Sequence, residues 1–176
     1  MAQIIKDRGL ADDHWRLLES AAGRLPEVSP LEDVIVPVDH WRAERDRFRR
    51  HAGRIGVWLK PGEDPALIAE DLPLFSVVAV QFPKPADGRG YSTGRLLRER
   101  YRYRGELRAI GDVQRDQLGF LWRCGFNAFV LRPGEDLRDA LAALGEFGEA
   151  YQASVEQPLP LFRRREAGSA DSREAS

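Results

Sequence analysis

The strongest constraint on the fold is a regular alternation of short apolar runs and helical segments between Asp33 and Leu131. The expected strands are Val34–Val38, Arg54–Leu59, Ser76–Phe82, Glu106–Ile110 and Asn127–Leu131. Strands separated by helices of this length join through right-handed βαβ crossovers, which produce a parallel sheet. Several of the runs are apolar almost throughout, which is typical of strands buried on both faces. We therefore predict an α/β fold with a mainly parallel sheet of about five strands, as a half-barrel or an open doubly wound sheet.

The segments between the strands carry signals for the starts and ends of helices. Asp39, Asp64 and Asp112 each stand where an N-cap is expected, and a proline suited to the first helical turn follows Asp64. Gly105 and Gly125 are the expected left-handed residues that end two of the helices. The expected helices are His40–His51, Pro65–Glu70, Ser92–Arg102, Val113–Cys124 and Asp136–Tyr151.

The two ends of the chain differ from this central pattern. Near the N-terminus, Gln3–Lys6 and His14–Leu18 flank a turn at residues 7–9, which predicts a short hairpin. The length of 176 residues suits a single domain, which we assign to residues 1–162. Residues 163–176 lack hydrophobic periodicity, so we expect a disordered tail.

Composition excludes several classes of protein. The net charge of -1 gives no overall attraction for nucleic acid or for an acidic membrane surface. No apolar run approaches the roughly 20 residues that span a bilayer, and the first residues lack the apolar core of a signal peptide. We therefore expect a cytoplasmic protein that binds neither nucleic acid nor membrane. A metal site is not expected, because Cys124 is the only cysteine and the three histidines have no ligand spacing. The cofactor, if there is one, is unknown.

Three expected strands end in a cation followed by proline, at Lys60, Lys84 and Arg132. In a parallel sheet these strand ends share one edge, where ligands of open α/β sheets bind. The three cations could therefore bind a small oxyanion or a phosphorylated ligand, assisted by nearby helix N-termini. The alternative is that they are solvated charges on surface loops.

A glycine-rich segment, residues 88–94, follows the third expected strand. It does not match the dinucleotide-binding fingerprint, because Thr93 stands where glycine is required and five residues separate the segment from the strand. Its backbone N–H groups could still form an anion-binding turn. In that turn Arg89, Tyr91 and Ser92 would be the ligand-binding side chains.

Two aspartates stand at strand-to-helix junctions on the same predicted edge. Asp112 is explained most simply as an N-cap, although it could also orient a ligand. Asp87 has no such structural explanation. It is therefore the candidate general base, with Arg89 and Lys84 stabilising a developing negative charge.

The segment from Arg89 to Arg104 is strongly basic. Arg95, Arg98 and Arg102 fall on one face of the expected helix. That face is either solvated or the docking surface for an acidic partner protein.

The runs Asp87-Gly-Arg-Gly-Tyr-Ser, Gly105-Glu-Leu-Arg-Ala-Ile-Gly-Asp and Arg123-Cys-Gly-Phe resemble an uncharacterised bacterial family, domain of unknown function 934. The resemblance continues to about Arg164. It implies an association with assimilatory sulfite reductase, and members are labelled as oxidoreductases of sulfite reduction. It supplies no catalytic residue.

Two functions follow as hypotheses. The first is an accessory protein of sulfur assimilation that binds a small oxyanion, sulfite reductase, or both. The second is an α/β enzyme, an oxidoreductase by the family's label, with its acid/base site at Asp87. A scaffold that only docks a partner through the basic helix is a third, weaker hypothesis.

Overall fold

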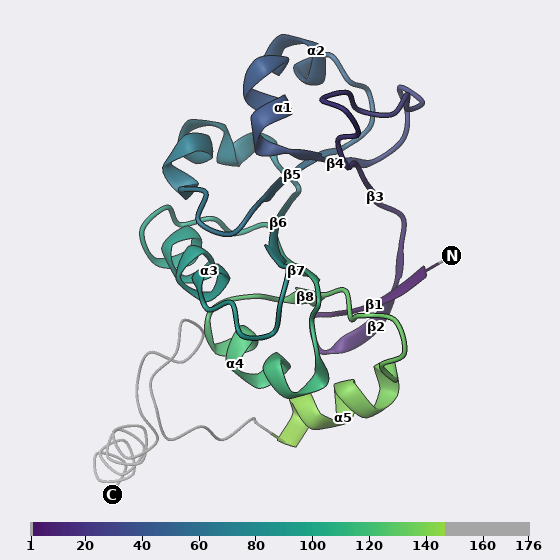
Figure 1. The fold of residues 1–176 in the computed structure, drawn as a ribbon, viewed down its shortest axis with the longest axis vertical. Coiled ribbons are helices and arrows are strands. Elements are labelled where there is room, and N and C mark those ends of the chain that lie inside the picture. Colours follow the sequence, from purple (N-terminus) through teal and green to yellow (C-terminus); the bar gives the residue numbers. More distant parts are fainter. Residues whose placement is uncertain (1, 147–176) are drawn as a thin grey trace, which may run out of the picture.

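The computed structural model describes residues 2–146 and contains one eight-stranded sheet (Figure 1). The strands are β1 Ala2–Lys6, β2 Gly9–Asp13, β3 Arg16–Leu17, β4 Val34–Pro37, β5 Ile55–Leu59, β6 Val77–Phe82, β7 Glu106–Gly111 and β8 Ala128–Phe129. The helices are α1 Val38–Ala43, α2 Arg45–Arg49, α3 Arg89–Glu99, α4 Leu118–Arg123 and α5 Leu137–Glu146, with 3-10 helices η1 Pro65–Leu74 and η2 Arg115–Gln117.

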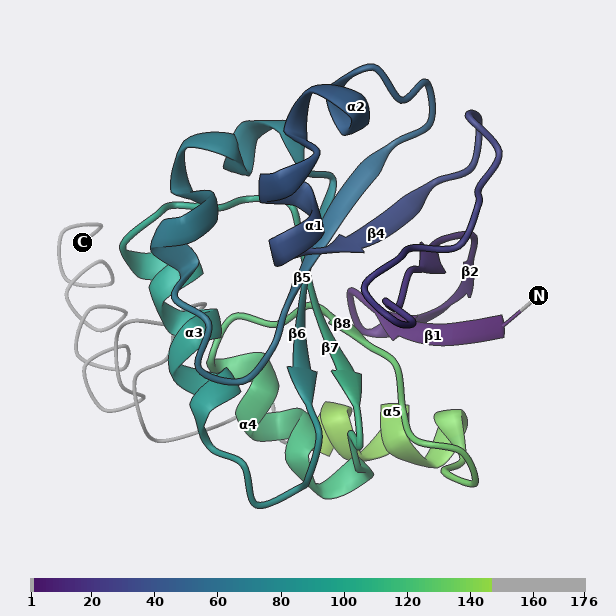
Figure 2. The same cartoon turned by 45° about the horizontal axis from the view of Figure 1, so that its top comes forward.

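Strands β3 to β8 lie side by side in chain order, and each pair among them is parallel. An open doubly wound sheet requires the strand order to reverse, so that alternative is wrong. Because each right-handed crossover advances the sheet in the same direction, α1, α3 and α4 lie on one side of the curved sheet (Figure 2). The fold is therefore the half-barrel alternative, with eight strands instead of about five.

The sheet is buried on both faces, as its apolar strands predict. On the helix side a large core includes Val57, Leu59, Val80 and Phe129 from the strands. On the concave side a smaller cluster is formed by Ile35, Trp58, Val77, Ala79 and Ile110, with Trp15 and Val130 beside it. The two sets alternate along each strand because successive side chains point to opposite faces.

The predicted N-terminal hairpin is present, but its second strand is Gly9–Asp13 instead of the expected His14–Leu18. Strand β1 pairs with β2 through a two-residue turn, in which Asp7 and Arg8 both have positive φ (48° and 61°), as tight hairpins require. The expected second strand, His14–Leu18, is wrong. Within it, Arg16–Leu17 forms β3 and pairs with β4 at the opposite edge of the sheet. Strand β1 pairs antiparallel with β8, so the sheet is not wholly parallel.

Two of the predicted helix ends are confirmed. The carboxylate of Asp64 accepts from the backbone N–H of Ala66 at 2.9 Å and caps η1, which runs on to Leu74. Gly125 directly follows Cys124, the C-cap of α4, and its φ of 100° is the left-handed conformation that ends a helix.

Three other expected helix ends are wrong. Helix α1 begins one residue before Asp39, whose carboxylate instead faces Lys60. Asp112 does not cap a helix, because the following helix begins after Gln114, whose side chain forms a capping box. Arg102, with a φ of 55°, takes the left-handed conformation expected of Gly105.

The last helix is confirmed as far as Glu146. Its cap is Asp136, whose carboxylate accepts from the backbone N–H groups of Arg138 and Asp139. The remainder of that expected helix, the domain boundary at residue 162 and the expected tail at 163–176 lie outside the described residues. Within residues 2–146, no helix is long and apolar enough to cross a bilayer.

Candidate functional site

A polar pocket of about 310 Å³ opens at the C-terminal ends of β4, β5 and β6. This edge is where the ligands of parallel α/β sheets bind. We call it the mouth pocket, and its lining residues are Glu19, Ser20, Pro37, Trp58, Lys60 and Gln81. The pocket therefore occupies the predicted edge, although only Lys60 among the predicted residues lines it.

Two parts of the chain far apart in sequence meet at this pocket through Trp58. The indole of Trp58 lies on the concave face, is 6% exposed, and donates from Nε1 to the carbonyl of Leu18 at 2.9 Å. The backbone N–H of Leu18 in turn donates to the carbonyl of Ile35. These bonds hold the segment after β3 against the sheet, which brings Glu19 and Ser20 to the pocket.

Lys60 is the cation of the mouth pocket. Its ammonium lies 3.0 Å from Asp39 Oδ2 and 5.8 Å from the centre of the Trp58 ring. Two effects act on the pKa of Asp39. Partial burial acts to raise it, but the hydrogen bonds from Lys60 and from the backbone N–H of His40 together act more strongly, and the net pKa is lowered. Both partners are about half exposed, and such pairs contribute only about 0–1 kcal/mol. An anionic ligand could therefore compete with Asp39 for the ammonium.

The other two strand-end cations do not join Lys60. Arg132 is held by Glu135 at 3.0 Å and by Asp112 at 3.6 Å. Lys84 is exposed, does not line the mouth pocket, and forms no ion pair within the described part of the chain. The expected cluster of three cations is therefore not present as a single site. Asp112 serves as a partner of Arg132, and a ligand role for either residue stays a prediction.

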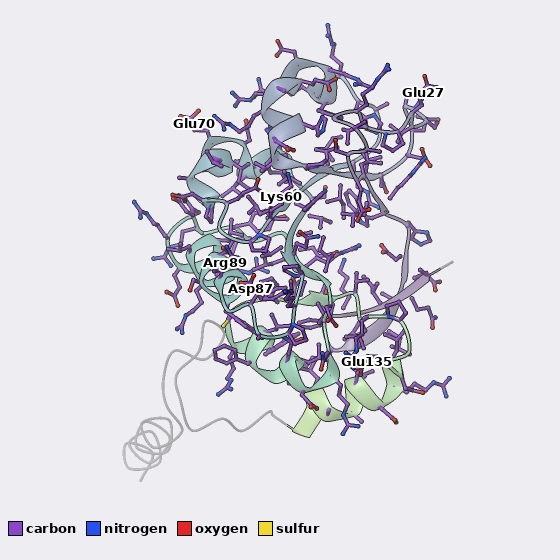
Figure 3. The ribbon with its side chains drawn as sticks, in the orientation of Figure 1. Glu27, Lys60, Glu70, Asp87, Arg89 and Glu135 are labelled. Atoms are coloured by element: carbon purple, nitrogen blue, oxygen red, sulfur yellow. The ribbon has the colours of Figure 1, made fainter. Side chains whose placement is uncertain are left out.

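Asp87 and Arg89 form their own ion pair beside the turn after β5 (Figure 3). The Asp87 carboxylate accepts from Arg89 Nη2 at 2.7 Å and from Arg89 Nε at 3.0 Å, and these bonds lower the pKa of Asp87. Arg89 reaches the neighbouring turn, where a Cβ added at Gly62 would lie 3.4 Å from its Nη1. Asp87 lines none of the four main pockets of the described residues. A paired carboxylate of lowered pKa is a poor general base near neutral pH.

The glycine-rich segment forms the first turns of α3 rather than the expected turn, and anion binding by Arg89, Tyr91 and Ser92 stays a prediction. Gly90 and Gly94 lie within α3, and an added Cβ would stand 2.6 Å from Phe82 and 2.4 Å from Phe126 respectively. These glycines therefore let α3 approach the sheet closely. Tyr91 packs between aromatic rings of the core edge, and its hydroxyl accepts from Gln117 Nε2 at 3.0 Å. Ser92 is exposed on α3.

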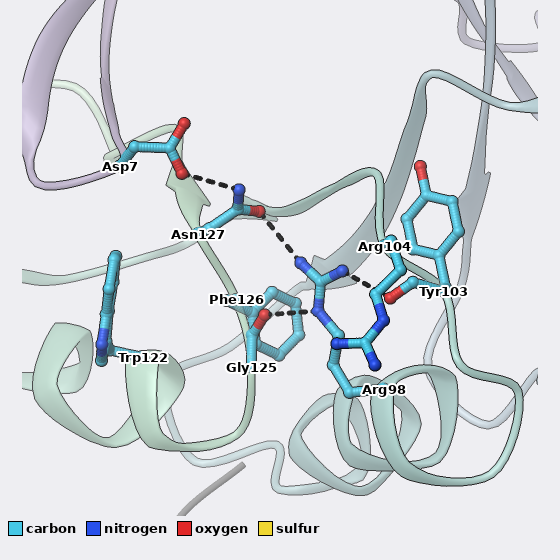
Figure 4. A pocket seen from close by; sticks show the side chains of 8 residues that line it. All are labelled: Asp7, Arg98, Tyr103, Arg104, Trp122, Gly125, Phe126 and Asn127. Atoms are coloured by element: carbon cyan, nitrogen blue, oxygen red, sulfur yellow. Dashed lines mark hydrogen bonds between the residues drawn. The ribbon is translucent and has the colours of Figure 1, made fainter. Parts of the chain in front are cut away.

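Arg98 is a partly buried internal brace rather than a solvated side chain (Figure 4), and docking of a partner by the basic helix stays a prediction. Its guanidinium donates to the carbonyls of Tyr103 (2.7 Å), Gly105 (2.9 Å) and Gly125 (2.9 Å) and to Asn127 Oδ1 (3.2 Å). These acceptors precede β7 and β8, so one side chain fixes both strand entries to α3. The predicted common face of Arg95, Arg98 and Arg102 is wrong, because α3 ends at Glu99 and Arg102 has a left-handed φ of 55° beyond it. Arg95 is exposed and pairs with Glu99 at 3.3 Å.

The residues that sequence reasoning missed are Glu19, Ser20, Trp58 and Gln81. Gln81 carried a usable signal, because it is the only strongly polar residue in the otherwise apolar run of β6. A polar side chain near the C-terminal end of a parallel strand favours a ligand role. Trp58 lies in β5, whereas Glu19 and Ser20 reach the pocket through the segment after β3, which the Trp58–Leu18 bond holds against the sheet. Within residues 2–146, no three His, Cys, Asp or Glu side chains gather as metal ligands.

The structure is thus a half-barrel α/β protein with a pocket at the C-terminal mouth of its sheet. A family model described as a bacterial protein of unknown function (DUF934) matches residues 56–162, and the chain belongs to this family. The match includes Trp58, Lys60 and Gln81 and begins after Glu19 and Ser20. No curated protein is similar enough in sequence to count as a relative.

Proposed function

We propose that this protein binds a small oxyanion, free or as part of a phosphorylated ligand, in the mouth pocket. The observation that supports it is the convergence of Lys60, Gln81 and Ser20 on one pocket at the C-terminal strand edge. An ammonium, an amide N–H and a hydroxyl are all donors to anionic oxygen. Trp58 supplies an apolar wall beside them, and lower local polarity strengthens such bonds.

The acidic side chain in the pocket narrows the choice of anion. Glu19 would repel a fully ionised ligand but can accept a hydrogen bond from one that carries an O–H group. A monoanion that keeps an O–H group, such as hydrogen sulfite or dihydrogen phosphate, therefore suits the pocket better than a dianion.

We propose sulfite as the physiological anion, and an accessory role in sulfur assimilation beside sulfite reductase. The support for the pathway is the family resemblance and what that resemblance implies. Deleting the gene and growing the cells on sulfate as the sole sulfur source tests it. A growth defect rescued by cysteine is the expected result, and normal growth without cysteine would refute the pathway.

Calorimetric titration with sulfite, sulfate and phosphate tests the ligand. Lys60→Met should weaken binding at least about tenfold, because a hydrogen bond to a charged group contributes about 1.5–3 kcal/mol. Lys84→Met is the matched control, since it removes the same charge from an exposed residue outside the pocket. No binding by the parent protein, or equal weakening in both variants, would contradict the proposal.

The alternative is an enzyme in which Asp87 acts as general base. It has less support, because Asp87 is paired with Arg89, its pKa is lowered, and the mouth pocket does not include it. An Asp87→Asn variant that binds sulfite as the parent does would favour the accessory role over this alternative.

A further inference from the structure

A second pocket, of about 280 Å³, lies at the N-terminal ends of the parallel strands, where β7 and β8 begin (Figure 4). We call it the Arg98 pocket, and its lining residues are Asp7, Arg98, Tyr103, Arg104, Trp122, Gly125, Phe126 and Asn127. It shares no residue with the mouth pocket. Any ligand here is therefore separate from the one proposed above.

The two side walls of the Arg98 pocket differ in chemistry. Figure 4 shows the guanidinium groups of Arg98 and Arg104 on one side and the indole of Trp122 on the other, with Gly125 to Asn127 between them. The guanidinium of Arg8 lies 4.7 Å from the centre of the Trp122 ring. One wall is thus cationic, and the other is an aromatic ring with the Arg8 guanidinium stacked over it.

The hydrogen bonds leave donors for an anion in this pocket. Arg98 Nη2 donates one bond, to Asn127 Oδ1, and therefore retains a second N–H. Asn127 Nδ2 donates one bond, to Asp7 Oδ1 at 2.8 Å, and likewise retains a second N–H. Arg104 is exposed, and no carboxylate pairs with its side chain within the described residues.

The charges in the Arg98 pocket are not balanced. Two guanidinium groups face one carboxylate, that of Asp7, which is already bonded to Asn127. Burial is the main cause that lowers the pKa of Arg98, and the positive charge of Arg104 lowers it further. A bound anion would relieve the repulsion between the two guanidinium groups, since opposite charges at this range attract.

We propose that the Arg98 pocket binds a small organic anion that joins one carboxylate or phosphate group to a flat ring. The anionic group contacts Arg104 and the remaining N–H groups of Arg98 and Asn127. The ring packs against Trp122. Inorganic anions lack the ring and therefore cannot make the contact with Trp122.

Benzoate is a suitable probe, and the indole N–H signals of the four tryptophans are suitable reporters in two-dimensional NMR. Trp122→Phe identifies the signal of the Arg98 pocket, and Trp58→Phe that of the mouth pocket. Benzoate should shift the Trp122 signal saturably and leave the Trp58 signal unchanged. Benzyl alcohol, which has the ring without the charge, should bind at least about tenfold more weakly.

Arg104→Gln should weaken benzoate binding about tenfold, since it removes a charged donor from an exposed position. Arg102→Gln is the matched control, because it removes the same charge two residues away and outside the pocket lining. The proposal is overturned by the absence of a saturable shift up to about 10 mM benzoate. Equal weakening in both variants, or a shift of Trp58 alone, would overturn it too. None of these results bears on sulfite binding at Lys60.

Discussion

Replacing Arg98 by methionine should destabilise the fold far more than removing any exposed arginine of the same helix. Methionine keeps much of the apolar stem but removes the guanidinium and the four hydrogen bonds that it donates. Three of the acceptors are backbone carbonyls at the entries of β7 and β8. After the substitution these carbonyls lose the Arg98 donor, and Tyr103, from one of those segments, is buried.

The size of the effect follows from these bonds. A hydrogen bond from a charged donor contributes about 1.5–3 kcal/mol net, but the four bonds share one group and do not add independently. Water entering the open pocket also satisfies part of the lost bonding. We therefore expect Arg98→Met to lower the free energy of unfolding by about 3–4 kcal/mol. Arg95→Met removes only an exposed pair with Glu99 on the same helix, at 3.3 Å, and should cost about 0.3–0.5 kcal/mol.

Urea unfolding followed by circular dichroism measures both values, and the slope of free energy against urea should stay the same if the unfolded state is unchanged. Arg98→Lys adds a sharper control, because a single ammonium cannot reach carbonyls that a planar fork holds together. It should recover less than half of the loss. If Arg98→Met and Arg95→Met destabilise equally, within about 0.5 kcal/mol, the role of Arg98 as a brace is refuted.

Two further predictions concern the core. Gly94→Ala should destabilise the fold by about 1–3 kcal/mol, because the added Cβ would stand 2.4 Å from Phe126. Gly145→Ala is the matched control in α5. Its added Cβ meets nothing within 4 Å, so this substitution should stabilise the helix by about 0.5–1 kcal/mol. Equal effects of the two substitutions in thermal unfolding would contradict the close packing of α3. Burial raises the pKa of Tyr103, whose hydroxyl donates to the Phe75 carbonyl at 3.1 Å. Above about pH 10 the unfolded phenol loses its proton while the folded one keeps it, so stability should fall with rising pH by up to about 1.4 kcal/mol per pH unit. Tyr103→Phe should remove this part of the decline, and parallel pH curves for parent and variant would refute it.

Part of the local chemistry was predictable from the sequence, although Asp39, Asp112 and Gly105 do not mark helix ends as expected. Asp64 and Gly125 were identified as helix ends because cap hydrogen bonds and left-handed backbone depend on a few neighbouring residues. The apolar runs likewise predicted β4 to β8 within a few residues, since burial on both faces requires such runs. Family membership was also predicted from sequence, through runs that lie mainly within the matched region.

Contacts between distant segments were not predictable in the same way. Nothing near Arg16–Leu17 indicates that it pairs with β4 rather than with β1, because that choice depends on the curvature of the whole sheet. The glycines of α3 suggested a turn, yet their partners Phe82 and Phe126 come from other elements. In the mouth pocket, too, residues placed by local sequence were predicted and residues placed by distant contacts were not. Lys60 was predicted from its strand end, whereas Ser20 reaches the pocket through a bond between Trp58 and Leu18 that no local pattern encodes.

The pairing of β1 with β8 affects how the chain folds during synthesis. Ile5 pairs with Phe129, so strand β1 leaves the ribosome more than a hundred residues before its neighbour does. At about 5–20 residues per second, this delay is on the order of ten seconds. During that time Ile4 and Ile5, both buried in the finished fold, have no sheet to cover them. The hairpin joins the sheet only after β8 has formed, which makes it a late step of folding and a point where chaperones can bind the unfinished chain.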